Sequence, residues 1–347
     1  MDGGPRAAGL RFPWAAPPAE GEGVEVAPGL LWLRLPLPMA LDHVNAYALE
    51  DADGWTLIDT GVDSSRARAI WARILAGPLK GRPVARVLLT HHHPDHVGLA
   101  GWFAGQGAEI LASRTAWLMA RMLTLDVQAR PTPEALRFWR RAGVPPETYA
   151  ARAEARPFNF ADCVAPILPG FRRLTEGQTI RLGGRDWRVR MGGGHAPEHA
   201  TLWEEGGDLV IGGDQLLPGI SPNVGVHPTE PEADPLADWI ESCARLAGHA
   251  REDQLVLPGH KLPYRGLPLR LRQLEENHAS ALARLEAWLA AGPRTAEGCF
   301  SPLFGRAIGP GEHGLALAEA VAHLNHLLHA GRARRELEGE AWIWRPA

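Results

Sequence analysis

THHHPDHVG (residues 90–98) follows directly after an apolar run at residues 84–89. It contains four potential metal ligands: His91, His93, Asp95 and His96. His91 and His93 are two positions apart, so at the end of an extended strand both side chains can lie on one side while His92 points away. Imidazole suits Zn²⁺ or Fe, and a carboxylate can help to hold a second ion. The stretch therefore predicts a metal site, with a solvated His-rich loop or a helix start capped by Asp95 as the alternatives.

Length and composition predict an ordinary globular protein. A chain of 347 residues fits one large domain with an appendage, or two domains. Hydrophobic residues make up 45% and charged residues 22%, which is typical of globular domains. The net charge of −4 gives no general attraction to nucleic acid or to an anionic membrane. We therefore expect a small-molecule partner.

Cysteine usage and hydropathy favour a cytoplasmic protein. Cys163, Cys243 and Cys299 are odd in number and widely spaced, so they indicate neither a disulfide framework nor a Cys metal pair. Residues 1–26 lack the apolar centre of a secretory signal. No apolar run reaches the length of about 18 residues that a spanning helix needs, so no membrane association is expected.

The pattern along the chain changes from strands to helices and back. Residues 1–23 are rich in Pro and Gly and predict an irregular arm. Short apolar or alternating runs then predict strands at residues 24–26, 30–35, 44–49, 55–59, 84–89 and 108–111, with helices at 64–76 and 96–104. Residues 113–170 interrupt the strands with three expected helices, at 113–126, 132–142 and 145–155. This block predicts a helical insertion.

Aromatic and methionine side chains are frequent in the expected insertion. They are Trp117, Met119, Met122, Phe138, Trp139, Phe158 and Phe160. Simple packing is their first interpretation, and as a group they can also wall a pocket for an apolar substrate.

Ligand-type residues recur at the ends of later strands. Strands are expected at residues 179–182, 187–191, 200–204, 208–211 and 255–257, with a helix at 235–247. Sharp Gly or Pro turns then present His195, Asp214 and His260, as residues 91–96 are presented after their strand. Ligands bind at such strand ends in open sheets that are covered by helices. Four sites of this kind are not explained by ordinary core packing.

These motifs resemble the metallo-β-lactamase-fold hydrolases. The H-x-H-x-D-H motif of that family stands here as residues 91–96, and Asp59-Thr60-Gly61, Gly194-His195, Gly213-Asp214 and Pro258-Gly259-His260 follow the family's order. The resemblance implies an α/β αββα sandwich over residues 24–265, with the metals at one edge. By the resemblance, His91, His93 and His195 bind one metal, Asp95, His96 and His260 bind a second, and Asp214 bridges them.

The implied cofactors are two divalent metal ions, Zn²⁺ first, with Fe or Mn as alternatives. Two such ions share a water, lower its pKa and generate a bridging hydroxide that attacks the substrate. Asp95 is placed to carry a proton, so Asp95 and Asp214 are the expected catalytic residues. Asp59 and His199 are expected to hydrogen-bond to ligands and orient them, with support of the backbone alone as the alternative for Asp59. For His43 a core or surface role is favoured.

Departures from the family pattern reduce the number of reactions and substrate classes that fit this sequence. His93 replaces the Glu of oxygen-reducing diiron relatives, which favours hydrolysis. The absence of a ligand Cys and of a signal peptide argues against a periplasmic β-lactamase. Glutathione-thioester relatives show Gly-His-x-Pro-Gly-His, and here Glu198 replaces the second Gly. The sequence therefore predicts hydrolysis of a small-molecule thioester, lactone or related ester.

The C-terminal residues 266–347 are expected to form a linker helix and a small winged-helix-like domain. Helices are expected at 267–291, 296–304 and 315–330, followed by a hairpin at 333–344. Such modules often bind nucleic acid, so a metal-dependent nuclease or phosphodiesterase is the alternative function. Helix 315–330 has no Arg or Lys and is expected to expose Glu319, His323, Asn325, His326 and His329, which argues against nucleic acid. The tail is instead expected to pack on the catalytic domain or on another subunit, as in a homodimer.

Overall fold

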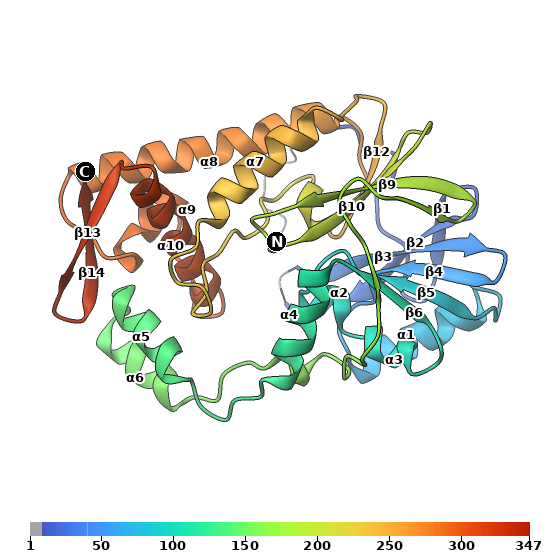
Figure 1. Cartoon of the computed structure of the whole chain (residues 1–347), viewed down its shortest axis with the longest axis horizontal. Helices are drawn as coiled ribbons and strands as arrows, with labels where there is room; N and C mark the ends of the chain where they lie inside the picture. The colour runs from blue at the N-terminus through green and yellow to red at the C-terminus, as the bar shows by residue number, and fades with distance from the viewer. Residues whose placement is uncertain (1–8, 40) are drawn as a thin grey trace.

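Two β-sheets pack face to face, with helices on both outer faces (Figure 1). The computed structural model describes residues 9–39 and 41–347, so the first part of the expected N-terminal arm, residues 1–8, lies outside the described residues. The predicted αββα sandwich is confirmed.

The first sheet places the ends of two central strands side by side. Its strands follow the sequence order: β1 (Gly23–Ala27), β2 (Leu30–Pro36), β3 (His43–Asp51), β4 (Gly54–Ile58), β5 (Val84–Leu88), β6 (Glu109–Ala112) and β7 (Arg172–Arg173). Strands β1 to β4 form an antiparallel meander, whereas β4 to β7 are parallel. Ile58 of β4 is in register with Leu88 of β5, so both strands end at the same edge.

The second sheet also places the ends of two neighbouring strands side by side. Its order is β12 (Leu255–Pro258), β11 (Leu209–Gly213), β10 (His199–Glu204), β9 (Arg185–Gly192) and β8 (Thr179–Leu182). Strands β11 and β12 are parallel, with Ile211 opposite Leu257, so their carboxyl ends lie next to each other. The two sheets therefore bring four strand-end loops together.

Large apolar side chains hold the layers together. Trp32 and Tyr47 of the first sheet and Trp187 and Leu202 of the second belong to one buried cluster between the sheets. Helix α1 (Ser65–Ala76) buries Ile70 and Trp71 against the first sheet. Helix α7 (Pro235–Ala247) buries Trp239 in the cluster behind the second sheet. Burial of such areas is the main stabilising contribution to the fold.

The helix expected at residues 96–104 is divided into α2 (Pro94–Val97) and α3 (Ala100–Ala104). The backbone of Leu99 between them donates instead to the hydroxyl of Thr60, at 3.0 Å. A Cβ at Gly98 would lie 2.4 Å from the carbonyl oxygen of Gly61. The prediction of one continuous helix was wrong because contact with the Thr60–Gly61 loop interrupts it.

The insertion reaches away from the sandwich. It contains α4 (Arg114–Leu125), α5 (Pro133–Arg141) and α6 (Pro146–Glu154), close to the expected bounds. Helix α4 lies near the first sheet, whereas α5 and α6 lie beside the C-terminal segment (Figure 1). Phe138 and Trp139 of α5 pack on the cluster that includes this segment. The insertion therefore connects the sandwich to the chain's last residues.

The C-terminal segment, residues 267–347, has the predicted order of helices and hairpin. It contains α8 (Leu267–Ala290), α9 (Phe300–Phe304), α10 (His313–His329), β13 (Ala333–Glu338) and β14 (Ala341–Pro346). It packs behind the second sheet, in contact with α7 (Figure 1). None of the described helices is long and apolar enough to cross a membrane.

The predicted exposed face of α10 was wrong. His323 is 1% exposed and Asn325 is fully buried, whereas Leu315 is 56% exposed. The amide of Asn325 donates to the carbonyls of Pro231 and Ala233. The loop before α7 therefore covers Asn325, and His278 of α8 lies against His323. Glu319 and His326 are half-buried, and His329 is exposed.

Candidate metal centre

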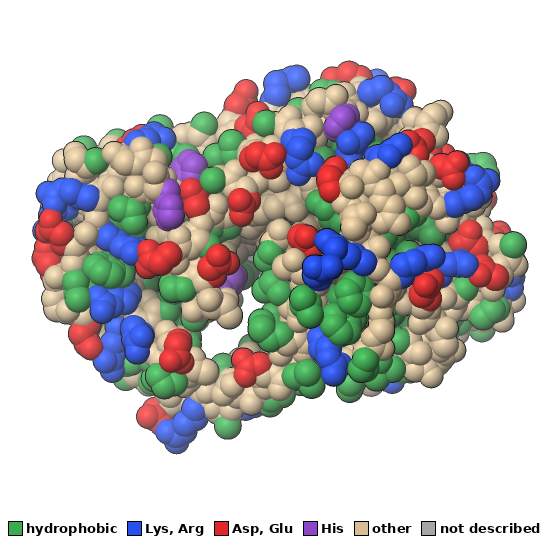
Figure 2. Space-filling view, in the orientation of Figure 1, with side chains coloured by type: hydrophobic (Ala, Val, Ile, Leu, Met, Phe, Trp, Pro, Cys, Tyr) green, Lys and Arg blue, Asp and Glu red, His purple; other side chains and the backbone are tan. Residues whose placement is uncertain are grey.

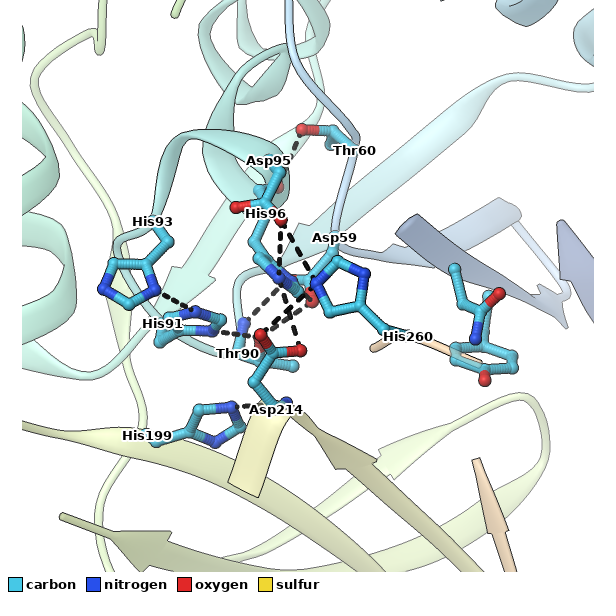
Figure 3. A network of polar contacts seen from close by, with 12 residues as sticks. Asp59, Thr60, Thr90, His91, His93, Asp95, His96, His199, Asp214 and His260 are labelled. Atoms are coloured by element: carbon cyan, nitrogen blue, oxygen red, sulfur yellow. Dashed lines mark hydrogen bonds and ion pairs between the residues drawn. The ribbon is translucent and has the colours of Figure 1, made fainter. Parts of the chain in front are cut away.

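Four strand ends build one cluster of His and Asp side chains (Figure 3). Strand β5 leads into His91, His93, Asp95 and His96; the loop between β9 and β10 carries His195; β11 leads into Asp214; and β12 leads into His260. All the sequence-predicted ligands therefore come together at one edge of the sandwich.

The first group comprises His91, His93 and His195. Their ligand atoms lie within 4.8 Å of one another. Nε2 of His91 is 3.0 Å from Nδ1 of His93. Burial, with the other histidines nearby, lowers the pKa of both residues well below the ordinary range. Neutral imidazoles keep a lone pair for a metal ion, so this group suits a divalent cation.

The second group comprises Asp95, His96 and His260, again within 4.8 Å. Oδ2 of Asp95 is 3.2 Å from Nε2 of His260. Burial lowers the pKa of His260, but Asp214 and Asp95 outweigh burial and raise it to about 10. Burial is likewise outweighed at His96, where the same carboxylates and Asp59 raise the pKa. The carboxylates therefore favour a positive charge here, which a cation would supply.

Asp214 lies between the two groups. Its Oδ2 is 3.5 Å from Nε2 of His195 and 3.3 Å from Nε2 of His260. Its Oδ1 is 3.5 Å from Nε2 of His96. Burial raises the pKa of Asp214, but the neighbouring imidazoles outweigh burial and hold it well below the usual range. One carboxylate can therefore contact both groups in its charged form.

Several buried atoms of the cluster fit a metal ion. Nε2 of His96, Nε2 of His195 and Oδ1 of Asp214 are buried without a hydrogen-bond partner among the described residues. Buried polar atoms without partners are costly and rare in folded proteins. These three atoms carry lone pairs and point into the cluster (Figure 3 for His96 and Asp214). The donor set of imidazoles and carboxylates is one that zinc, iron and manganese accept.

Hydrogen bonds at Nδ1, on the side of the ring away from the cluster, orient three of the imidazoles. Nδ1 of His96 lies 2.8 Å from the Asp59 carboxylate. Nδ1 of His260 lies 2.9 Å from the carbonyl of His43. Nδ1 of His195 lies 2.8 Å from the carbonyl of Asn223. Because carbonyl and carboxylate oxygens can only accept, each Nδ1 carries a proton and leaves Nε2 toward the cluster.

Asp59 also braces the backbone that carries the histidines. Its carboxylate accepts from the Thr90 backbone at 2.8 Å and from the Thr90 hydroxyl at 2.7 Å. Asp59 itself has a positive φ of 61°, which is strained for a residue with a side chain. Both roles that the sequence suggested for Asp59, support of a ligand and support of the backbone, occur together.

His199 and Glu198 support the site in different ways. Nε2 of His199 accepts from the backbone of Asp214 at 3.0 Å and so fixes the start of that loop. Glu198, which departs from the thioesterase pattern, accepts from the backbone of Thr115 at 2.8 Å. A carboxylate at the first turn of α4 is favourable. Glu198 thereby anchors the insertion beside the metal centre.

His92 lies outside the ligand groups. It is 7% exposed, and its ring stacks on Phe160 with centroids 6.4 Å apart. Asn223 supports the site through its backbone carbonyl, which accepts from Nδ1 of His195. Sequence reasoning missed this contact because a backbone carbonyl leaves no side-chain pattern.

The close fit of α7 explains the glycine before His195. Gly194 has a φ of 94°, and a Cβ there would lie 2.5 Å from Cβ of Trp239. Any side chain would therefore push the loop away from α7 and displace His195.

Two family models match the chain. The first, described as the metallo-beta-lactamase superfamily, matches residues 39–287. The second, described as the metallo-beta-lactamase-like C-terminal domain, matches residues 282–345.

Known proteins are similar over most of the chain. A probable metallo-hydrolase, YqjP, of Bacillus subtilis is 28% identical over 85% of this chain and 91% of that protein. A beta-lactamase domain protein from Burkholderia ambifaria is 37% identical, covers 97% of this chain and 98% of its own, and has a TM-score of 0.90. A metallo-beta-lactamase family protein from Thermus thermophilus is 30% identical, covers 93% of this chain and 100% of its own, and has a TM-score of 0.78.

Proposed function

The chain belongs to the metallo-β-lactamase superfamily and is a metal-dependent hydrolase, and we propose that it uses two metal ions to cleave a small-molecule thioester, lactone or related ester. The observation that carries the proposal is the place of Asp214, whose oxygens face His195 on one side and His96 and His260 on the other.

We assign His91, His93 and His195 to one ion, and Asp95, His96 and His260 to the other, with Asp214 between them. Zinc is the proposed metal, with iron or manganese as alternatives. When bound, the ions would activate a water and polarise the scissile carbonyl. Asp95, whose side chain is 20% exposed, is the proposed carrier of a proton between the site and solvent.

Apolar side chains support an ester with a hydrophobic group. Leu118, Met122 and Leu125 of α4 are exposed by 51%, 46% and 66%, and their spacing puts them on one helix face. Phe158, 65% exposed, contacts Phe160, which stacks on His92 beside the first ligand group. Figure 2 shows an opening beside this region, with hydrophobic side chains along its α4 side.

Charge pairing makes the nuclease alternative less favourable. The arginines of the C-terminal hairpin region each pair with an acid: Arg332 with Glu286, Arg334 with Glu336 and Arg335 with Glu232. Phosphate binding requires arginines that are available for the nucleic acid backbone.

We further propose that residues 24–265 form the catalytic domain, with the insertion at about 113–170, and that residues 266–347 form a winged-helix-like domain. Strand β12 is the last strand of the sandwich, and α8 begins directly after it. Nothing about this division requires a second subunit, so a monomer and a homodimer are both compatible with it.

Metal analysis coupled to a substrate screen tests the proposal. Protein purified without chelator should hold two ions per chain and hydrolyse members of a panel of thioesters and lactones, but not phosphodiesters. His93→Ala should lose ester hydrolysis, whereas His249→Ala should retain it, because His249 is exposed and belongs to neither ligand group. Cleavage of phosphodiesters alone, or full activity in His93→Ala, would contradict the proposal.

A further inference from the structure

A chain of hydrogen bonds runs from the candidate metal centre into the C-terminal segment. Nδ1 of His195 donates to the carbonyl of Asn223 at 2.8 Å. The side-chain amide of the same Asn223 donates to Oε2 of Glu319 at 2.8 Å and to the carbonyl of Leu315 at 3.2 Å. Both acceptors belong to α10, about 120 residues further along the chain than His195.

We propose that Glu319 is a positioning residue for the metal ligand His195, acting through Asn223, so that the C-terminal segment forms part of the metal centre. This inference rests on the proposed function, because it takes His195 as a ligand. It assigns the C-terminal segment a role in metal binding rather than in recognition of nucleic acid.

The segment that carries Asn223 has little support of its own. Residues 217–234 lie between the helical turn Asp214–Leu216 and α7, and they form neither helix nor strand. A carbonyl in such a segment is not fixed by a ladder of backbone hydrogen bonds, so its position depends on contacts from outside. The aim of His195 Nε2 depends in turn on that carbonyl.

The C-terminal segment supplies those contacts. Arg270 of α8 donates to the carbonyls of Leu217 and Ile220. The backbone of Val226 donates to the carbonyl of Ala318 at 3.0 Å. Glu319 adds the contact at Asn223 itself, the residue that touches the ligand. The C-terminal segment therefore contacts the chain before Asn223, at Asn223 and after it.

The burial of Glu319 also indicates a specific role. Its side chain is half-buried on a helix face that packs against the loop, and burial raises its pKa to about 7 despite the bond from Asn223. An acid in such surroundings destabilises the fold in its charged form unless its contacts compensate. A leucine would be the more stable choice for packing alone, so the hydrogen bond to Asn223 accounts for a polar residue here.

The test compares three variants with the wild-type chain. Glu319→Leu removes the acceptor, Glu319→Gln keeps an acceptor oxygen, and Asn223→Ala removes the donor while it keeps the backbone carbonyl. Glu276→Leu makes the same chemical change at an exposed site of α8 and serves as the matched control. Zinc affinity is measured by competition with a chelator, and the cobalt-substituted protein is examined by absorption spectroscopy.

We expect Glu319→Leu to weaken the binding of one of the two ions by about 10-fold, the lower end of the range for losing the direct partner of a ligand, because the carbonyl of Asn223 remains but is less firmly held. The cobalt spectrum should change, the other ion should bind as before, and Glu319→Gln should restore most of the affinity. If Glu319→Leu does not fold, Asn223→Ala carries the same expectation. Unchanged affinity and spectrum in a folded Glu319→Leu or Asn223→Ala would overturn the proposal.

A His195→Ala variant separates this inference from the proposed function. If wild-type protein binds two ions and His195→Ala loses one, the ligand assignment stands whatever Glu319 does. If His195→Ala binds both ions with wild-type affinity, the ligand assignment itself fails, and the role of Glu319 fails with it.

Discussion

The two ligand groups of the candidate metal centre are supported by different parts of the molecule. Asp95 and His96 follow one strand, and Asp59, from the neighbouring strand end, holds both His96 and the backbone of Thr90. His195 instead sits in a glycine loop whose supporting carbonyl is held by α10. The group of Asp95, His96 and His260 is thus supported within the sandwich. The other group shares the braced strand end through His91 and His93, but its third ligand, His195, depends on residues distant in the sequence, so the two groups should respond differently to mutation.

Asp214→Ala should give the largest effect, because this side chain faces both ligand groups and its loss should weaken metal binding at both. We expect turnover to fall by more than about 100-fold, beyond the range for losing a partner behind a ligand. Both metal affinities should fall as well, measured by chelator competition. A variant that keeps two tightly bound ions and normal turnover would remove the basis for a bridging role.

Asp59→Asn should weaken the group of Asp95, His96 and His260 more than the group that contains His195, because Asp59 contacts the His96 ring directly. An amide cannot accept from both Thr90 and His96 as the carboxylate does, so the affinity for one ion should drop by about 10- to 100-fold. The cobalt spectrum should show the loss at the group opposite to the one affected by Glu319→Leu. If Asp59→Asn and Glu319→Leu weaken the same ion, the division into two separately supported groups is wrong.

Acid should destabilise the C-terminal segment that supports His195. Nδ1 of His278 in α8 lies 3.2 Å from Nε2 of His323 in α10. Burial lowers the pKa of His278 to about 3 and that of His323 to about 4. Because the folded state holds both rings neutral, unfolding takes up protons below the ordinary histidine pKa of about 6.5, and stability falls as the pH drops from there toward 4.

His278→Gln measures this contribution. At pH 5 the wild-type chain should lose about 2 kcal/mol more free energy of unfolding, relative to pH 7.5, than the variant does. Denaturant unfolding of metal-free protein at both pH values checks this, since the titration of other groups cancels in the difference. Equal pH dependence in the two proteins would show that His278 does not titrate on unfolding.

The same contrast explains what the sequence could predict. The sandwich and the cluster of ligand-type residues follow from local patterns: an apolar run, a Gly or Pro turn, and then His or Asp, as at residues 84–96. The family resemblance and the fold are confirmed, and the ligand set stays a prediction that the geometry supports. Local patterns suffice for this region because parallel strands necessarily end at a common edge.

Sequence patterns failed where residues distant in the sequence determine the surroundings of a side chain. The sequence pattern places His323 and Asn325 of α10 in solvent, yet α8 covers His323 and the 217–234 segment covers Asn325. The carbonyl of Asn223 has no sequence pattern because every residue has one. Likewise the contact of Gly98 with the Thr60–Gly61 loop, which divides α2 from α3, depends on a loop more than 30 residues away.

Leu118→Ser should give the smallest effect, because it changes neither support of the metals. Leu118 is 51% exposed on the apolar face of α4, so its loss should leave metal content and unfolding free energy close to wild type. For an ester with a hydrophobic acyl group, removing the equivalent of one to two buried methylene groups should raise KM about four- to fifteenfold while kcat stays the same. Steady-state kinetics with a series of acyl lengths checks this, with Leu337→Ser, an exposed leucine of the hairpin, as the matched control. An equal effect on short and long acyl groups would mean that α4 does not contact the apolar part of the substrate, and the apolar face would then need another partner.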